Sequence, residues 1–163
     1  MRAGRAGAGR PARPARGGRA IVRAVHAPPF SIFSAVSELL VTAGVLFVIR
    51  RNWTRRPFPF ALFLAVTLFE ACVNVLYMAS RASQAAVGAQ TLSPALRLAF
   101  ALHGMLSLLA FAAFVVLGVL AHQDQKRGRW FFPEHPALTW TFLAVWIVSV
   151  GSGEALFVAR YLL

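Results

Sequence analysis

The fold is decided by residues 94–121, which read PALRLAFALHGMLSLLAFAAFVVLGVLA and carry a single charged side chain, Arg97. A helix of about 20 apolar residues is long enough to cross the hydrocarbon core of a bilayer. Ser93 precedes the stretch as a typical N-cap, and Pro94 suits the first turn of a helix. We therefore expect a membrane-spanning helix over about 94–121.

Three further apolar segments have the same character. They cover about 31–49, 59–80 and 136–162, with Pro59 suited to a first turn. Arginines border them at Arg50, Arg81 and Arg160. Four spans joined by short connections predict an all-α, integral membrane four-helix bundle with up-down topology over residues 28–163.

The composition agrees with a membrane protein. Hydrophobic residues make up 58% of the 163 residues and charged residues 13%, which is too apolar for a soluble domain. A net charge of +12 would indicate nucleic acid binding in a soluble protein. Here the basic residues flank the spans, so we expect membrane lipid as the partner and no nucleic acid. Cys72, the single cysteine, is expected to be buried within its helix.

Residues 1–27 form an Arg-, Ala-, Gly- and Pro-rich tail, with seven arginines in the first 23 positions. Such a composition buries little apolar surface, so we expect disorder. The tail could bind anionic lipid, act as a targeting segment or reflect a start codon assigned too early. The basic loops at Arg50–Arg56 and Lys126–Arg129 share one side, and the positive-inside rule places them in the cytoplasm of a bacterial inner membrane. Both termini are then expected outside, although the tail opposes this orientation.

Three of the five acidic residues lie inside predicted spans: Glu38, Glu70 and Glu154. Inserting such a group near the bilayer centre costs at least about 2.5 kcal/mol, so intramembrane carboxylates usually mark a functional interior. Counted from the side of the termini, these glutamates and His103 lie at about 9–16 Å depth. We therefore predict one polar layer to which every helix contributes an ionisable side chain.

Helical periodicity places further polar side chains beside these four. Thr67, Glu70, Asn74 and Tyr77 form one stripe, Ser34, Glu38 and Thr42 a second, and His103 and Ser107 a third. We expect all three stripes to face the bundle interior. The small residues Ser149–Gly153 should let a neighbouring helix approach closely. An aromatic belt is expected at the loop end, from Trp53, Trp130, Phe131, Phe132 and Trp140, with solvated histidines at His26, His122 and His135.

The layer admits several functions. It could bind a divalent metal, with His103, Glu70 and Glu154 as the best ligands, or relay protons. It could bind haem or a quinone through His103, or form a polar network that only fixes helix packing. The Glu-x-x-His pairs of di-iron bundles are absent, and no residues that recognise a substrate are evident, so an enzyme is less expected.

The second half of the chain resembles a family of small bacterial four-helix membrane proteins of the YozB/CtaM type. The shared pattern is His103 early in the third span, the Lys126–Arg129 loop, His135, Trp140 and the small-residue segment 148–153. The family's second span usually carries a histidine where this chain has Tyr77, Met78 and Ser80, and Glu38, Glu70 and Glu154 are not expected in it. The resemblance implies an accessory role in the maturation of a respiratory haem-copper oxidase, with an oxidase subunit as partner. The alternative, from another class, is a small proton-conducting or transporter-like protein that uses the intramembrane glutamates.

Overall fold

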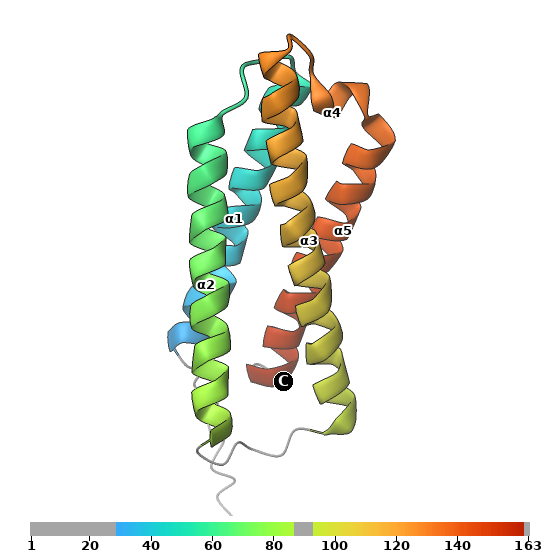
Figure 1. Ribbon diagram of the computed structural model, residues 1–163. Helices are drawn as coiled ribbons and strands as arrows, with labels where there is room; N and C mark the ends of the chain where they lie inside the picture. The colour runs from blue at the N-terminus through green and yellow to red at the C-terminus, as the bar shows by residue number, and fades with distance from the viewer. Residues whose placement is uncertain (1–28, 87–92, 162–163) are drawn as a thin grey trace, which may run out of the picture.

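The computed structural model describes residues 29–86 and 93–161, with side chains described for 31–80 and 93–159. It contains the helices α1 (Pro29–Trp53), α2 (Phe60–Ala86), α3 (Pro94–Lys126), α4 (Phe131–Glu134) and α5 (Pro136–Tyr161). All but α4 are long and apolar enough to cross a membrane (Figure 1). The predicted all-α four-helix membrane bundle is confirmed. The predicted tail, residues 1–27, lies outside the described residues, as does His26.

The helix ends follow from local chemistry. Ser93 caps α3, because its Oγ accepts a hydrogen bond from the N–H of Leu96 at 3.3 Å, and Pro94 occupies the first turn as predicted. α2 begins just after Pro59, whose carbonyl accepts from the N–H of Phe63 at 2.9 Å. After α3, Gly128 adopts a φ of 74°, a conformation that glycine takes at no steric cost. The chain thus reverses within a few residues at each basic loop.

The third span is longer than predicted, which changes the position of His122. α3 continues to Lys126 rather than ending near residue 121. His122 therefore lies on a helix and not in a loop, and its ring stacks on Phe60 with centroids 4.2 Å apart. The backbone N–H of Phe58 donates to the Gln125 side chain, which ties the α1–α2 loop to the end of α3.

The short helix α4 corrects the predicted aromatic belt. Phe131 and Phe132 are 6% and 1% exposed and belong to the core, so they do not anchor the protein at the membrane surface. The N–H of Phe132 donates to Asn52 Oδ1 at 3.2 Å, and Thr139 Oγ1 donates to the Phe132 carbonyl at 3.1 Å. α4 therefore closes the loop end of the bundle. Of the expected belt, Trp140 is clearly exposed, at 64%.

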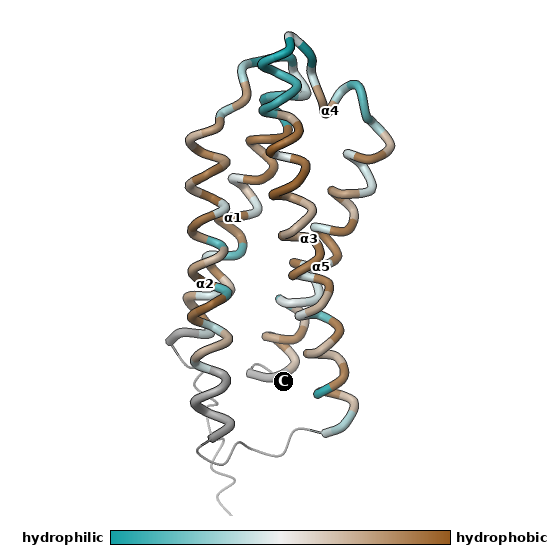
Figure 2. The backbone as a smooth tube through the Cα atoms, in the orientation of Figure 1, coloured by the Kyte–Doolittle hydropathy of each residue, from teal (hydrophilic) through white to brown (hydrophobic). Residues whose placement is uncertain are grey.

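The apolar core lies in the half of the bundle that is closest to the basic loops. It is built around Val45, Phe63, Phe114, Phe142 and Trp146, contributed by all four long helices. The outer faces of the helices are apolar as well, as expected where they meet lipid tails (Figure 2). Cys72 lies on such an outer face and is exposed, so the prediction of a buried cysteine is wrong.

Glycines allow two close helix contacts in this half. A Cβ atom on Gly44 of α1 would lie 2.7 Å from Val66 Cγ2 of α2. A Cβ atom on Gly118 of α3 would lie 2.1 Å from the Phe63 ring of α2. Small residues of this kind drive helix association in membranes, because they let backbones approach and van der Waals contacts form.

Candidate functional site

Glu38 on α1 and His103 on α3 meet above Gly153 on α5. A Cβ atom on Gly153 would lie 2.8 Å from His103 Cε1, 3.2 Å from His103 Nε2 and 3.2 Å from Glu38 Oε2. Real Cβ atoms almost never approach other atoms within 3.0 Å, so a larger residue would displace the imidazole. The carboxylate and the imidazole therefore share one space, which exists because residue 153 has no side chain.

The hydrogen bonds of His103 define its tautomer. Its Nδ1 lies 2.9 Å from Ser152 Oγ, and Ser152 Oγ donates its only proton to the Ser149 carbonyl at 2.7 Å. Ser152 Oγ must then accept from His103, so Nδ1 carries the hydrogen. In the neutral imidazole Nε2 is consequently the acceptor. This nitrogen is the one that faces the same space as Glu38 Oε2.

A small cavity lies between Glu38 of this pair and Glu70 of α2. Its volume is about 20 Å³, and its polar lining comes from Glu38, Glu70, Ser107 and Ser149. A cavity of roughly 10–15 Å³ or more that offers two to four polar partners has room for a water molecule. The two hydroxyls lie 2.8 Å apart and bridge α3 and α5. One water in this cavity would place Glu38 and Glu70 on a common hydrogen-bonded path.

The polar stripe of α2 faces inward only in part. Glu70 lines the cavity and is partly exposed, and Thr67 and Tyr77 are likewise half-buried. Asn74 is exposed, which corrects the expectation that the whole stripe turns inward. Its Nδ2 reaches back along the helix to Glu70 Oε1 and to the Glu70 carbonyl, both at 3.0 Å. The reason is that α2 packs mainly on α1 and makes few contacts with α3, so one side of the helix stays uncovered.

Glu154 completes the set of ionisable side chains. Glu38 interacts electrostatically with both Glu70 and Glu154, so α1, α2 and α5 bring their carboxyl groups into one region. Within the described part of the chain, Glu154 Oε1 and Thr67 Oγ1 are buried without a hydrogen-bond partner. Buried polar atoms without partners are uncommon, and they often indicate a bound water or a functional role. The structure thus brings Glu38, Glu70, His103 and Glu154 together, and their use stays a prediction.

The sequence analysis did not predict the hydrogen bonds of three site residues, Ser149, Ser152 and Trp146. Ser149 and Ser152 appeared only as small residues, although their spacing of three places both hydroxyls on one face of α5. Trp146 had no predicted partner, yet its Nε1–H donates to Thr42 Oγ1 of α1 at 3.1 Å. The stripe that contains Glu38 and Thr42 was the available signal, because an indole N–H buried in a membrane bundle needs an acceptor and the Thr42 hydroxyl offers one.

His135 lies apart from the layer. It is exposed at the start of α5, where its ring packs on Phe131 with centroids 4.7 Å apart. About 35 Å of helix separates His103 from Lys126, the last residue of α3 beside the basic loops. His103 and His135 therefore cannot bind one ligand in this arrangement. Among residues 29–86 and 93–161, no three His, Cys, Asp or Glu side chains are placed to hold a metal ion.

No family model, curated protein or solved structure matches the chain. The resemblance to the YozB/CtaM type therefore rests on the residues quoted above and stays a prediction. What the structure adds is the position of its two histidines, one in the polar layer and one at the loop end. The space beside His103 is filled by Glu38 and α5, and the adjoining cavity has room for a water rather than for a porphyrin.

Proposed function

We propose that this chain is a membrane protein that transfers protons through its bundle, with Glu38 and His103 as the central pair. The observation that supports it is the geometry over Gly153, where an acceptor nitrogen and a carboxyl group face one space. Within the described residues no hydrogen bond or ion pair joins the two side chains, so neither holds the other's proton in place. A carboxyl group and a neutral imidazole can each accept and release a proton, and the pair is therefore suited to pass a proton on when the environment of either residue changes.

The small cavity extends the path from Glu38. A water between Glu38 and Glu70 would let a proton reach α2, where Glu70 is partly exposed. Hydroxyl groups at Ser107 and Ser149 can both donate and accept, as a relay requires. Chains of Glu, Asp and His inside membranes commonly serve as proton relays in pumps and transporters.

The apolar core closes the path toward the basic loops. Phe114 and Phe142 are buried and lie on the loop side of the layer. Apolar constrictions of this kind gate channels by excluding water. We therefore expect transfer across the whole membrane to be slow at rest and to require transient wetting or separation of these aromatic rings.

Proton flux into liposomes tests the proposal. The full chain is reconstituted with a pH-sensitive dye inside, and a potassium diffusion potential drives protons inward. We expect flux for the wild type, loss of flux for Glu38→Gln and reduced flux for Glu70→Gln. Glu134→Gln, the same change on the exposed helix α4, is the matched control and should conduct normally. Absence of wild-type flux, or equal flux in Glu38→Gln and the control, would contradict the proposal.

We also propose that the basic loops face the cytoplasm of a bacterial inner membrane. Arg50, Arg55, Arg127 and Arg129 are exposed at the same end of the bundle, where basic residues gather in the cytoplasm (Figure 2). An Arg129→Cys variant in a Cys72→Ser background tests this in intact cells. A membrane-impermeant maleimide should label it only after the membrane is opened, and labelling of intact cells would reverse the orientation.

The function implied by the resemblance, an accessory role in maturation of a haem-copper oxidase, stays a separate prediction. It requires that deletion of the gene lowers the haem a absorbance of the membranes. Restoration by the wild type but not by His103→Ala would support it, and unchanged spectra would exclude it. His103 is the one residue that both functions need, since it carries the resemblance and lies in the polar layer.

A further inference from the structure

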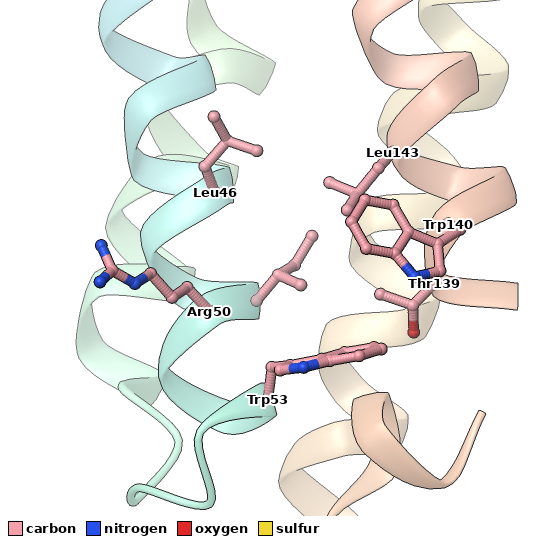
Figure 3. A pocket seen from close by; sticks show the side chains of 7 residues that line it. Leu46, Arg50, Trp53, Thr139, Trp140 and Leu143 are labelled. Atoms are coloured by element: carbon pink, nitrogen blue, oxygen red, sulfur yellow. The ribbon is translucent and has the colours of Figure 1, made fainter. Parts of the chain in front are cut away.

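A second feature, apart from the polar layer, is an apolar groove between α1 and α5. It has a volume of about 250 Å³ and opens on the outside of the bundle beside the basic loops (Figure 3). Leu46 and Ile49 of α1 form one wall, and Trp140 and Leu143 of α5 form the other. Trp53 closes the end of the groove nearest the loop, with its ring 6.1 Å from Trp140 in an edge-to-face arrangement.

The groove lies at the depth where lipid headgroups meet acyl chains. Trp53 is partly exposed and Trp140 largely exposed at this end, and tryptophan prefers the interface of a bilayer. Arg50 follows in the last turn of α1. Its aliphatic stem borders the groove, and its guanidinium points outward, away from α5 (Figure 3).

Arg50 is available for an anion. Its guanidinium makes no hydrogen bond or ion pair with any residue that the structure describes, whereas Arg51 Nε donates to the Pro57 carbonyl at 3.0 Å. Glu134 of α4 does not compensate the charge of Arg50, because it already pairs with Arg129 at 2.8 Å. A planar guanidinium binds phosphate through paired hydrogen bonds. The groove thus combines an apolar slot with a cation at its edge.

We infer that this groove binds one acyl chain of an anionic glycerophospholipid whose phosphate pairs with Arg50. The volume supports a single chain, since it is below the roughly 300–1,000 Å³ of sites that enclose whole drug-sized ligands. The charge selects the headgroup: each basic residue near the membrane surface contributes about 1 kcal/mol toward anionic lipid, which is about fivefold enrichment. The chain occupies the slot lengthwise, and the tryptophans pack against its upper carbons.

Quenching of tryptophan fluorescence tests the inference. The full chain is placed in phosphatidylcholine vesicles that contain a minority of phosphatidylglycerol with brominated acyl chains. We expect quenching well above that caused by the same amount of brominated phosphatidylcholine, equivalent to about fivefold enrichment near the reporter. Trp140→Phe should remove most of the excess, and Trp130→Phe, outside the groove, should leave it unchanged.

The headgroup contact has its own matched pair of variants. Arg50→Gln should abolish the excess quenching, whereas Arg56→Gln should preserve it, because Arg56 is an exposed residue of the adjoining α1–α2 loop that does not line the groove. Equal quenching by the two brominated lipids would overturn the inference, because the groove would then hold only bulk lipid. Loss of the excess in both variants would overturn it too, as would no quenching by either lipid, which would mean that a second copy covers the groove.

Discussion

The two halves of the bundle are built by opposite means. Toward the basic loops, Phe63, Phe114 and Phe142 interlock with ring centroids 5.2–6.4 Å apart, and α4 closes the end. Toward the other end, α3 has no buried residue before Ala110 within its described length, and polar contacts such as His103–Ser152 join the helices. Local stability follows buried apolar contact, so the polar half should open more readily. The aromatic half near the basic loops is thus the rigid one, and the polar half, which carries the ionisable side chains, is the looser, more mobile one.

Truncation in the rigid half should have the largest effect. Phe114 is 2% exposed and contacts aromatic rings from α2 and α5, so Phe114→Ala leaves a cavity among three helices. We expect a loss of about 3–5 kcal/mol in the free energy of unfolding. Unfolding in mixed micelles, followed by circular dichroism, measures it. A loss below 1 kcal/mol, on the order of a mild repacking, would mean that the halves do not differ as described.

Two glycines in the looser half form a matched pair. A Cβ atom on Gly153 would meet His103 and Glu38, whereas Gly151, two residues earlier, has nothing within 4 Å. Alanine favours a helix over glycine by about 1 kcal/mol, so Gly151→Ala should be neutral or stabilising. Gly153→Ala should lie about 1–3 kcal/mol below it, because the added methyl group overpacks the site. The same variant should lose proton flux, and equal behaviour of the two variants would contradict the geometry over Gly153.

A hydrogen bond in the polar layer should matter less. Ser107→Ala removes the 2.8 Å contact with Ser149 Oγ between α3 and α5. Interhelical hydrogen bonds in membranes contribute about 0.6 kcal/mol on average, so we expect a loss of that size. A double-mutant cycle with Ser149→Ala isolates the pair. A coupling above about 2 kcal/mol would show that the layer, and not the aromatic core, holds this half together.

The smallest effect is expected at the exposed end of the rigid half. The backbone N–H of Trp130 and then the guanidinium of Arg129 hold the pKa of Glu134 below its ordinary 4.5. On acidification, Glu134 is therefore protonated in the unfolded chain before it is protonated in the folded chain. The stabilisation that ionised Glu134 gives to the fold is complete above about pH 4.5, and it is lost as the pH falls through the lower pKa of the folded state. The difference in Tm between wild type and Glu134→Gln should shrink over that range. A difference that does not change with pH would contradict it.

The sequence predicted the spans well, but it predicted poorly which face of each helix is buried. Length and hydropathy suffice for four helices, and the Ser93–Pro94 start of α3 was correct because capping is local chemistry. The burial of Cys72 and the inward turn of Asn74 were wrong. Lipid tails are as apolar as a protein core, so an apolar helix face does not reveal which of the two it meets.

The candidate site was predictable to a similar extent. Depth counting brought Glu38, Glu70, His103 and Glu154 to one level, because the rise of a helix is fixed. It could not show that Gly153 is where two of them meet, since that depends on the crossing of α1, α3 and α5. α4 was missed for a related reason: Phe131–Glu134 is one turn long, and its burial depends on a partner far away in the chain.

The contact between α4 and Asn52 has a consequence for the order in which the bundle assembles during synthesis. Asn52 is fully buried, and its Oδ1 accepts from the N–H of Phe132, which is synthesised 80 residues later. At about 5–20 residues per second, the ribosome needs several seconds to supply it. By the end of that interval α1 and α2 have left the ribosome, but the Asn52 side chain still lacks the Phe132 N–H as its hydrogen-bond donor. The first two helices are thus inserted before the bundle can close. The hydrogen bond of Asn52 can form only after Phe132 has been synthesised.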